Sequence, residues 1–195
     1  MKGDKTWVQF VNAETNEQSK QWIHTHSPNK PKKFKETLEQ KMMATEFWDR
    51  KGLLLTEFMA PGTTITSEVH CEMLNKLWRS IQIKQRRMLT KGIVLLHDSA
   101  RPHTAVGTNA LIKLFKWEIS DHPPYSPDLP PSDYHLFTKM KFWLATHRFH
   151  NNEELMDGVN NWLHNLAAPF VDEGLQKLVS RYDKCRNVDG NYVEK

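Results

Sequence analysis

The sequence has only two cysteines and no long hydrophobic run. Cys71 and Cys185 form neither a CxxC pair nor a Cys/His motif. This argues against a disulfide framework and a cysteine-based zinc site, and it indicates a reducing compartment. No apolar run approaches the roughly 18 residues of a membrane span, and the polar start MKGDKTW lacks the apolar segment of a secretory signal. We therefore predict a soluble, intracellular protein with no membrane partner.

The chain also has no internal repeat and no low-complexity tract. Its 195 residues, 38% of them hydrophobic and 26% charged, suffice for one domain with a hydrophobic core and are too few for two comfortable ones. We therefore expect residues 1–195 to form a single domain. The net charge of +4 and the isoelectric point near 9.0 favour an anionic partner without requiring one.

Three β-strands are predicted in the first third of the chain. Residues 5–11, KTWVQFV, alternate in character and are rich in strand-forming side chains. The apolar segments 42–48 and 53–59 flank the polar turn 49–52, a pattern typical of a β-hairpin. Residues 12–37 are polar and contain many lysines, so a long excursion between the first two strands is expected.

The remainder of the chain alternates between helical and strand patterns. Val69, Met73, Leu77 and Ile81 recur at the spacing of an amphipathic helix, and residues 92–98, GIVLLHD, read as a strand buried on both faces. The other predicted elements are a helix over 103–115, a strand over 117–120, and helices over 132–145 (with Ser132 as N-cap), 152–166 and 169–185. This order predicts an α/β protein with a ribonuclease H-like fold, in which helices flank a mixed five-stranded sheet.

Acidic residues fall where such a fold could gather them. Asp98 ends the buried strand, Asp133 follows a proline-rich loop with 34 residues between the two, and Asp4 lies at the first strand. In this fold the first and fourth strands are central neighbours, so three carboxylates could meet and would be tolerated only if cations neutralised them. Two Mg²⁺ ions about 3.5–4 Å apart would then clamp the attacking and leaving oxygens of a phosphodiester.

Each of these acids has a structural alternative. An aspartate that ends a strand is more often a loop cap than a ligand, and Asp128 competes with Asp133 in the same loop. From the pattern alone, three other acids are equal candidates for the first position: Glu46, Asp49 and Glu57. His97, His103 and His122 also suggest a metal, but their irregular spacing favours exposed or strand-end histidines.

Several blocks of sequence resemble the signature segments of mariner-type transposases. The two main blocks are 97-HDSARPHTA-105 and 121-DHPPYSPDLPPSDYHLF-137. Five shorter blocks extend the resemblance over the whole chain: 3-GDKTW-7, 27-SPNKPKKFK-35, 42-MMATEFWD-49, 181-RYDKC-185 and 190-GNYVEK-195. Because these blocks occur in the family's order, the resemblance is specific.

The resemblance implies a function and a set of site residues. The three matching catalytic acids would be Asp4, Asp98 and Asp133, binding two Mg²⁺ or Mn²⁺ ions, and the family spacing favours Asp133 over Asp128. Glu46, Asp49 and Glu57 are then expected to lie away from this acid cluster. It further implies cleavage at transposon ends, joining to TA target DNA in the nucleus without a protein nucleophile, and a DNA-bound homodimer clasped by the loop at 12–37. Residues 146–195 would form C-terminal helices.

Some features depart from the family pattern. A helix-turn-helix domain should precede the catalytic core, whereas this sequence starts three residues before Asp4, so the first strand is expected to be shortened and to fray. Lys5 replaces an acid, Ser99 replaces an asparagine, and Pro131 replaces a smaller residue. These departures predict impaired catalysis, with an inactive relic or a co-opted DNA-binding, dimerising protein as the alternative.

DNA contacts are expected to be made mainly with phosphates, and to be weak and salt-dependent. The candidate residues for this surface are Lys32, Lys33, Lys35, Arg86, Arg87, Arg101 and His103.

Overall fold

The computed structural model describes residues 1–9, 41–60, 62–120 and 129–187. Several sequence predictions lie outside these residues and are not addressed by the structure. They are the last two residues of the first predicted strand (10–11), the loop at 12–37, His122, Asp128, the three lysines at 32, 33 and 35, and the end of the C-terminal segment (188–195).

A mixed five-stranded sheet forms the centre of the fold, as predicted. Its strands are β1 (Lys2–Gln9), β2 (Lys41–Asp49), β3 (Gly52–Met59), β4 (Ile93–Leu96) and β5 (Trp117–Ser120). The spatial order is β3-β2-β1-β4-β5. The β1–β2 and β2–β3 pairs are antiparallel, while β1–β4 and β4–β5 are parallel. The ribonuclease H-like prediction is therefore confirmed.

The first strand begins three residues earlier than its sequence pattern indicated. All eight residues from Lys2 to Gln9 pair with β2. Among the described residues of β1, only Lys2 pairs with β4, opposite Leu96. The flanking Met1 adds two backbone hydrogen bonds. Its nitrogen donates to the Val94 carbonyl at 2.7 Å, and its carbonyl accepts from the Leu96 nitrogen at 2.9 Å. The antiparallel and parallel halves of the sheet are thus joined over a short length next to Asp4.

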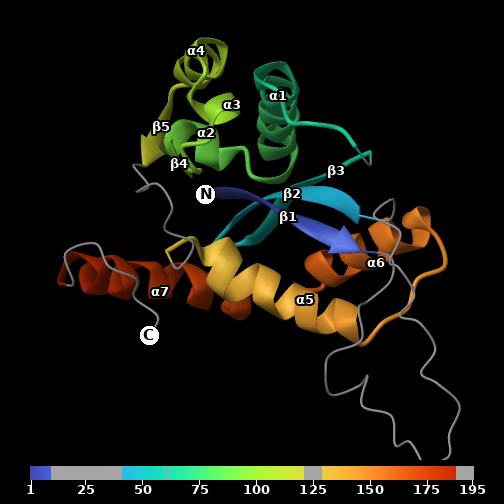
Figure 1. Cartoon of the computed structure of the whole chain (residues 1–195). Coiled ribbons are helices and arrows are strands. Elements are labelled where there is room, and N and C mark those ends of the chain that lie inside the picture. The colour runs from blue at the N-terminus through green and yellow to red at the C-terminus, as the bar shows by residue number, and fades with distance from the viewer. Residues whose placement is uncertain (10–40, 61, 121–128, 188–195) are drawn as a thin grey trace, which may run out of the picture.

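Helices cover the two faces of the sheet in separate layers (Figure 1). One layer contains α1 (Ser67–Lys84), α2 (Arg87–Lys91), α3 (Arg101–Thr104) and α4 (Val106–Leu114). The other contains the π-helical turn η2 (Ser132–Phe137), α5 (Thr138–Ala145), α6 (Asn152–His164) and α7 (Ala168–Asn187). Each layer has its own buried hydrophobic cluster against the sheet. None of the described helices is long and apolar enough to cross a membrane.

The inner face of α1 is built from the predicted apolar stripe with one polar addition. Met73, Leu74, Leu77 and Ile81 are buried, and His70 shares their face one turn earlier. Thr66 caps the helix, because its hydroxyl accepts a hydrogen bond from the backbone of the first turn. A buried histidine on an apolar stripe requires polar neighbours.

Gly3 is required by the close approach of an aromatic ring within the sheet. A Cβ atom at this position would lie 2.5 Å from Cε1 and 2.7 Å from Cδ1 of Phe47, its partner on β2. We expect Gly3→Ala to lower the free energy of unfolding by about 1–3 kcal/mol, because the buried ring must shift. Chemical denaturation measures this loss. Gly107→Ala is the matched control, since nothing lies within 4 Å of its added Cβ, and an equal loss in that variant would contradict the explanation.

Candidate active site

The three predicted acids lie on elements that converge beside the centre of the sheet. Asp4 is two residues beyond Lys2, and Asp98 is two residues beyond Leu96, the residue that pairs with Lys2 across the parallel strands. Asp133 lies on η2, which contacts β1. Burial, together with the negative charges of Asp4 and Asp98, raises the pKa of Asp133 to about 6. Asp4 and Asp98 therefore both lie close enough to Asp133 for their charges to act on it.

Asp98 is positioned by the turn that follows β4. Its Oδ1 accepts a hydrogen bond from the Ala100 nitrogen at 3.1 Å and lies 2.5 Å from Nδ1 of His103. Burial alone would raise the pKa of Asp98, but the contact with His103 outweighs it and holds the pKa well below its usual range. Lys5 also lowers this pKa through its charge. Asp98 is thus an ionised carboxylate with a fixed orientation.

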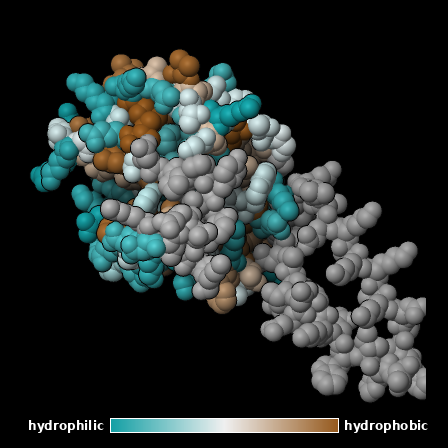
Figure 2. Space-filling model, turned by 60° about the vertical axis from the view of Figure 1, so that its left-hand side comes forward, coloured by the Kyte–Doolittle hydropathy of each residue, from teal (hydrophilic) through white to brown (hydrophobic). Residues whose placement is uncertain are grey.

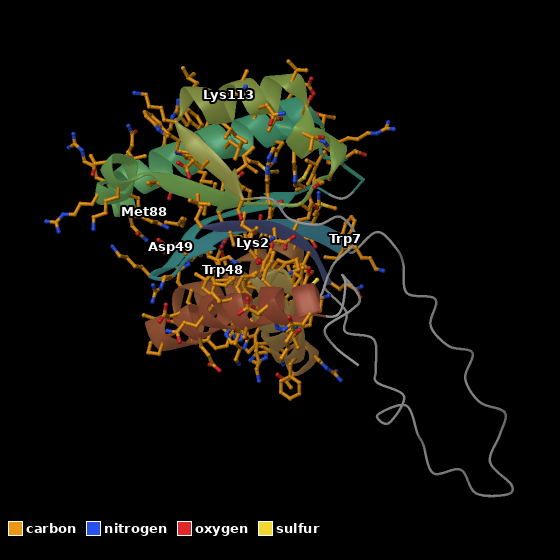
Figure 3. The ribbon with its side chains drawn as sticks, turned by 90° about the vertical axis from the view of Figure 1, so that its left-hand side faces the viewer. Lys2, Trp7, Trp48, Asp49, Met88 and Lys113 are labelled. Carbon is orange, nitrogen blue, oxygen red and sulfur yellow. The ribbon has the colours of Figure 1, made fainter. Side chains whose placement is uncertain are left out.

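Asp133 is held by the anchoring of η2 on both sides. Nε1 of Trp48 donates to the Ser132 hydroxyl at 3.1 Å, so Ser132 does not act as the predicted N-cap but ties η2 to β2. The Tyr134 hydroxyl donates to the Gly174 carbonyl at 2.6 Å, which ties the same turn to α7. Figure 3 shows Trp48 pointing from the sheet toward these C-terminal elements. A π-helical turn held in this way is common at functional sites.

Asp4 has a cation beside it that the sequence reading missed. The Lys2 ammonium lies 3.3 Å from Asp4 Oδ2, and the Lys2 side chain is only 1% exposed. This is an ion-pair distance without hydrogen-bond geometry, since the Lys2 nitrogen has no hydrogen-bond partner. The Lys2 charge also lowers the pKa of Asp133. Residues two apart on a strand point to the same face, which is the signal that could have identified Lys2.

Glu46 was expected to lie away from the acid cluster, and that expectation is wrong. It pairs directly with Asp4 across β1 and β2, is fully buried, and has no hydrogen-bond partner on either carboxylate oxygen. Burial and, to a smaller extent, the charge of Asp4 raise the pKa of Glu46 to about 8. Asp49 and Glu57 do lie elsewhere: Asp49 bonds the Gln85 side chain at 3.2 Å, and Glu57 pairs with a lysine of α1.

The buried Glu46 predicts a specific pH dependence of stability. Because its folded pKa of about 8 exceeds its ordinary value of 4.5, the folded protein holds a proton that the unfolded chain releases. Its contribution to the free energy of unfolding is therefore largest below pH 4.5 and falls by up to about 1.4 kcal/mol per pH unit until pH 8. Glu46→Gln removes this term and keeps the shape of the side chain.

Denaturation of both proteins in EDTA at pH 5 to 8 measures this difference. We expect the free energy of unfolding of wild type, relative to that of Glu46→Gln, to decrease steadily as the pH rises. A difference independent of pH would contradict a buried, protonated Glu46.

Three of the residues predicted to contact DNA are exposed in the structure. Arg86 precedes α2, Arg87 begins it, Arg101 begins α3, and all three residues are exposed. His103 is buried and faces Asp98, so it does not belong to this surface. On the face drawn in Figure 2, hydrophilic side chains surround smaller hydrophobic patches over the layer that contains α1 and α4.

The three acids fit a divalent cation, but two lysines of the chain oppose its charge. Three carboxylates in a common field provide the oxygen ligands and the negative charge that hard cations prefer. The ligand oxygens of these three acids do not all lie within 4.8 Å of one another. The side chains would therefore have to move closer together around an ion. Lys2 and Lys5 place positive charge against Asp4 and Asp98.

Comparison with known proteins identifies the family. A family model described as transposase (partial DDE domain) matches residues 12–91. The solved catalytic domain of Mos1 transposase with raltegravir and Mn superposes with a TM-score of 0.80 at 30% identity, covering 99% of this chain and 84% of that one. The chain belongs to the mariner transposases. The match extends over the catalytic domain of that family and confirms the resemblance noted in the sequence.

Curated relatives of this mariner catalytic domain are longer proteins. The human histone-lysine N-methyltransferase SETMAR is 33% identical over 98% of this chain, and the mariner Mos1 transposase of Drosophila mauritiana is 31% identical over 98%. The chain spans 28% of the first relative and 55% of the second. A Mos1 paired-end complex with Mn superposes with a TM-score of 0.84 at 33% identity, covering 99% of this chain and 56% of that one.

Proposed function

We propose that this mariner catalytic domain cleaves DNA phosphodiesters and transfers the cut strand, with Asp4, Asp98 and Asp133 holding two divalent cations. The observation that carries the proposal is the placement of the three acids where β1, the end of β4 and η2 meet: Lys2 pairs with Leu96, each two residues before an acid, and η2 contacts β1. Mos1 catalytic domains solved with Mn and with Mg support a divalent cation.

The chain's own residues have defined roles in this reaction. The bound cations would activate the attacking oxygen and stabilise the leaving one. Asp98 is kept ionised and oriented by His103, and Asp133 is kept in place by the Trp48–Ser132 contact. A serine or cysteine nucleophile is not needed, because the attacking group is water or a DNA 3′ hydroxyl.

DNA is the proposed substrate and partner. Mos1 relatives have been solved as a pre-cleavage transpososome and as a strand transfer complex, which supports DNA contacts by exposed residues such as Arg86, Arg87 and Arg101. A homodimer on DNA, a TA target and a nuclear location are further parts of the proposal. They rest on the family resemblance.

A second candidate is a protein that binds DNA without cutting it. Lys2 within 3.3 Å of Asp4, together with the charge of Lys5 near Asp98, favours this alternative because both lysines oppose a bound cation. Weak, salt-sensitive DNA binding with no nicking in either metal is its signature.

Supercoiled plasmid nicking tests the proposal through its metal requirement. We expect slow nicking in Mn²⁺, less in Mg²⁺ and none in EDTA, because the carboxylates contribute chemistry only through a cation. Lys5→Glu should increase the rate, since it removes a positive charge near Asp98. Nicking that persists in EDTA would refute the mechanism, and an absence of nicking in both metals with DNA binding intact would favour the second candidate.

A further inference from the structure

Three buried histidines meet beside the acid cluster without belonging to it. His70 comes from α1, His97 follows β4 and His103 lies on α3, and their exposed fractions are 3%, 6% and 7%. One ring nitrogen from each lies within 4.8 Å of the others, and they form the one such group among the described ranges. His97 and His103 share a sequence block, but only the fold brings His70 to them.

Two of these rings have buried nitrogens without a hydrogen-bond partner. They are Nε2 of His70 and Nδ1 of His97. A buried polar atom left unpaired costs about 1–3 kcal/mol. Apolar side chains of similar size would fill the same space without that cost. The two unpaired ring nitrogens are explained if they bind a ligand.

His103 is oriented as metal-binding histidines commonly are. Its Nδ1 lies 2.5 Å from Asp98 Oδ1, and the same nitrogen is 3.2 Å from the Asp98 carbonyl oxygen. This arrangement commits Nδ1 to the aspartate and leaves Nε2 as the ligand atom. A carboxylate that fixes the far nitrogen of a ligating histidine is a usual outer partner of such sites.

We propose that His70, His97 and His103 form a transition-metal site, distinct from the carboxylate site, that binds one Zn²⁺-like ion and leaves a fourth position for water. Imidazole nitrogens suit Zn²⁺, whereas Mg²⁺ prefers oxygen. Three protein ligands with an open position are a common zinc arrangement.

The rings must adjust to bind this ion. Ligand nitrogens in a tetrahedral zinc site lie about 3.3 Å apart, given zinc–nitrogen bonds of about 2.0–2.1 Å. The rings are now stacked, with centroids 4.1 Å apart for His70 and His103 and 5.2 Å apart for His97 and His103. Coordination therefore requires rotations about χ2 and nitrogen shifts on the order of 1 Å. The charge of Lys5 opposes the ion and that of Asp98 favours it.

An ion at this site would connect three elements directly. It would join α1 and α3 to the end of β4, the segment that carries Asp98. Because the ion binds the folded state, it should raise the melting temperature as its concentration exceeds the dissociation constant. It would also fix His103 and, through it, the orientation of Asp98.

Co²⁺ absorption and thermal unfolding of the metal-stripped protein test this site. We expect the intense visible absorption of a four- or five-coordinate ion to saturate at one Co²⁺ per chain, and this absorption to be lost on addition of Zn²⁺ but not of excess Mg²⁺. His70→Phe should weaken binding by more than the roughly 10–100-fold that loss of an outer partner costs. His164→Phe, on the exposed surface of α6, is the matched control and should bind as wild type does.

Two further measurements separate this site from the carboxylates and from misfolding. Asp4→Asn should leave the Co²⁺ spectrum unchanged, and a spectrum lost in that variant would assign the ion to the acid cluster and overturn the proposal. Zn²⁺ should raise the melting temperature of wild type, which does not depend on any variant folding. The proposal would also be overturned if Zn²⁺ did not raise the melting temperature of wild type, or if a folded His70→Phe variant bound Co²⁺ as tightly as wild type.

Discussion

Asp98→Asn is expected to reduce Mn²⁺-dependent plasmid nicking by at least about 10²–10³-fold, the scale seen when one group that stabilises a transition state is removed. Asparagine can still accept the hydrogen bond from Ala100, so the turn after β4 is retained. What is lost is the negative charge that attracts the cation. Initial rates of conversion from supercoiled to open-circular plasmid measure the effect.

The control for this substitution is Asp157→Asn on the exposed side of α6. It makes the same chemical change at a helix surface and should leave the rate unchanged. Nicking retained in Asp98→Asn would mean that the activity comes from a contaminant or from another site.

Lys2→Met is expected to increase the affinity for Mn²⁺ at least tenfold. The ammonium lies 3.3 Å from Asp4 Oδ2 in a buried position, where a unit charge acts on a neighbour with an energy of up to about 4 kcal/mol at an effective dielectric constant of 20. A tenfold change needs about 1.4 kcal/mol of this. Methionine keeps the length of the side chain without its charge, and Mn²⁺ titration followed by electron paramagnetic resonance measures the dissociation constant.

The same substitution should lower the stability of the metal-free protein, because Asp4 loses its cation while Asp133 and Glu46 remain nearby. Mn²⁺ should restore that stability. Lys76→Met, which removes an exposed lysine from an ion pair on α1, is the control and should change neither quantity. An unchanged or weakened Mn²⁺ affinity in Lys2→Met would show that Lys2 does not compete with the cation.

Local patterns were sufficient to predict most of the fold. The β2–β3 hairpin follows from two apolar segments around a polar turn, and Gly52 adopts the positive φ of 133° that the turn requires. The buried stripe of α1 follows from helical spacing. The early start of β1 could not be predicted, because Lys2, Gly3 and Asp4 have little intrinsic strand preference and are held there by pairing with β2.

The three candidate acids could be named from spacing and family resemblance, whereas their polar surroundings could not. Glu46 lies 42 positions from Asp4 along the chain, and only the register of β1 and β2 makes them neighbours. His70 was overlooked because its helix pattern was read from apolar residues alone. In each case a polar residue stands at a position where burial is expected, and this is the signal to look for.

Anomalous diffraction from crystals of the chain soaked in Mn²⁺ tests the assignment of Asp4, Asp98 and Asp133 as cation ligands most directly. We predict a manganese peak about 2.0–2.5 Å from carboxylate oxygens of Asp98 and at least one of the other two acids, with the Lys2 ammonium displaced from Asp4. Manganese found only at other positions, with the ammonium still beside Asp4, would contradict the assignment.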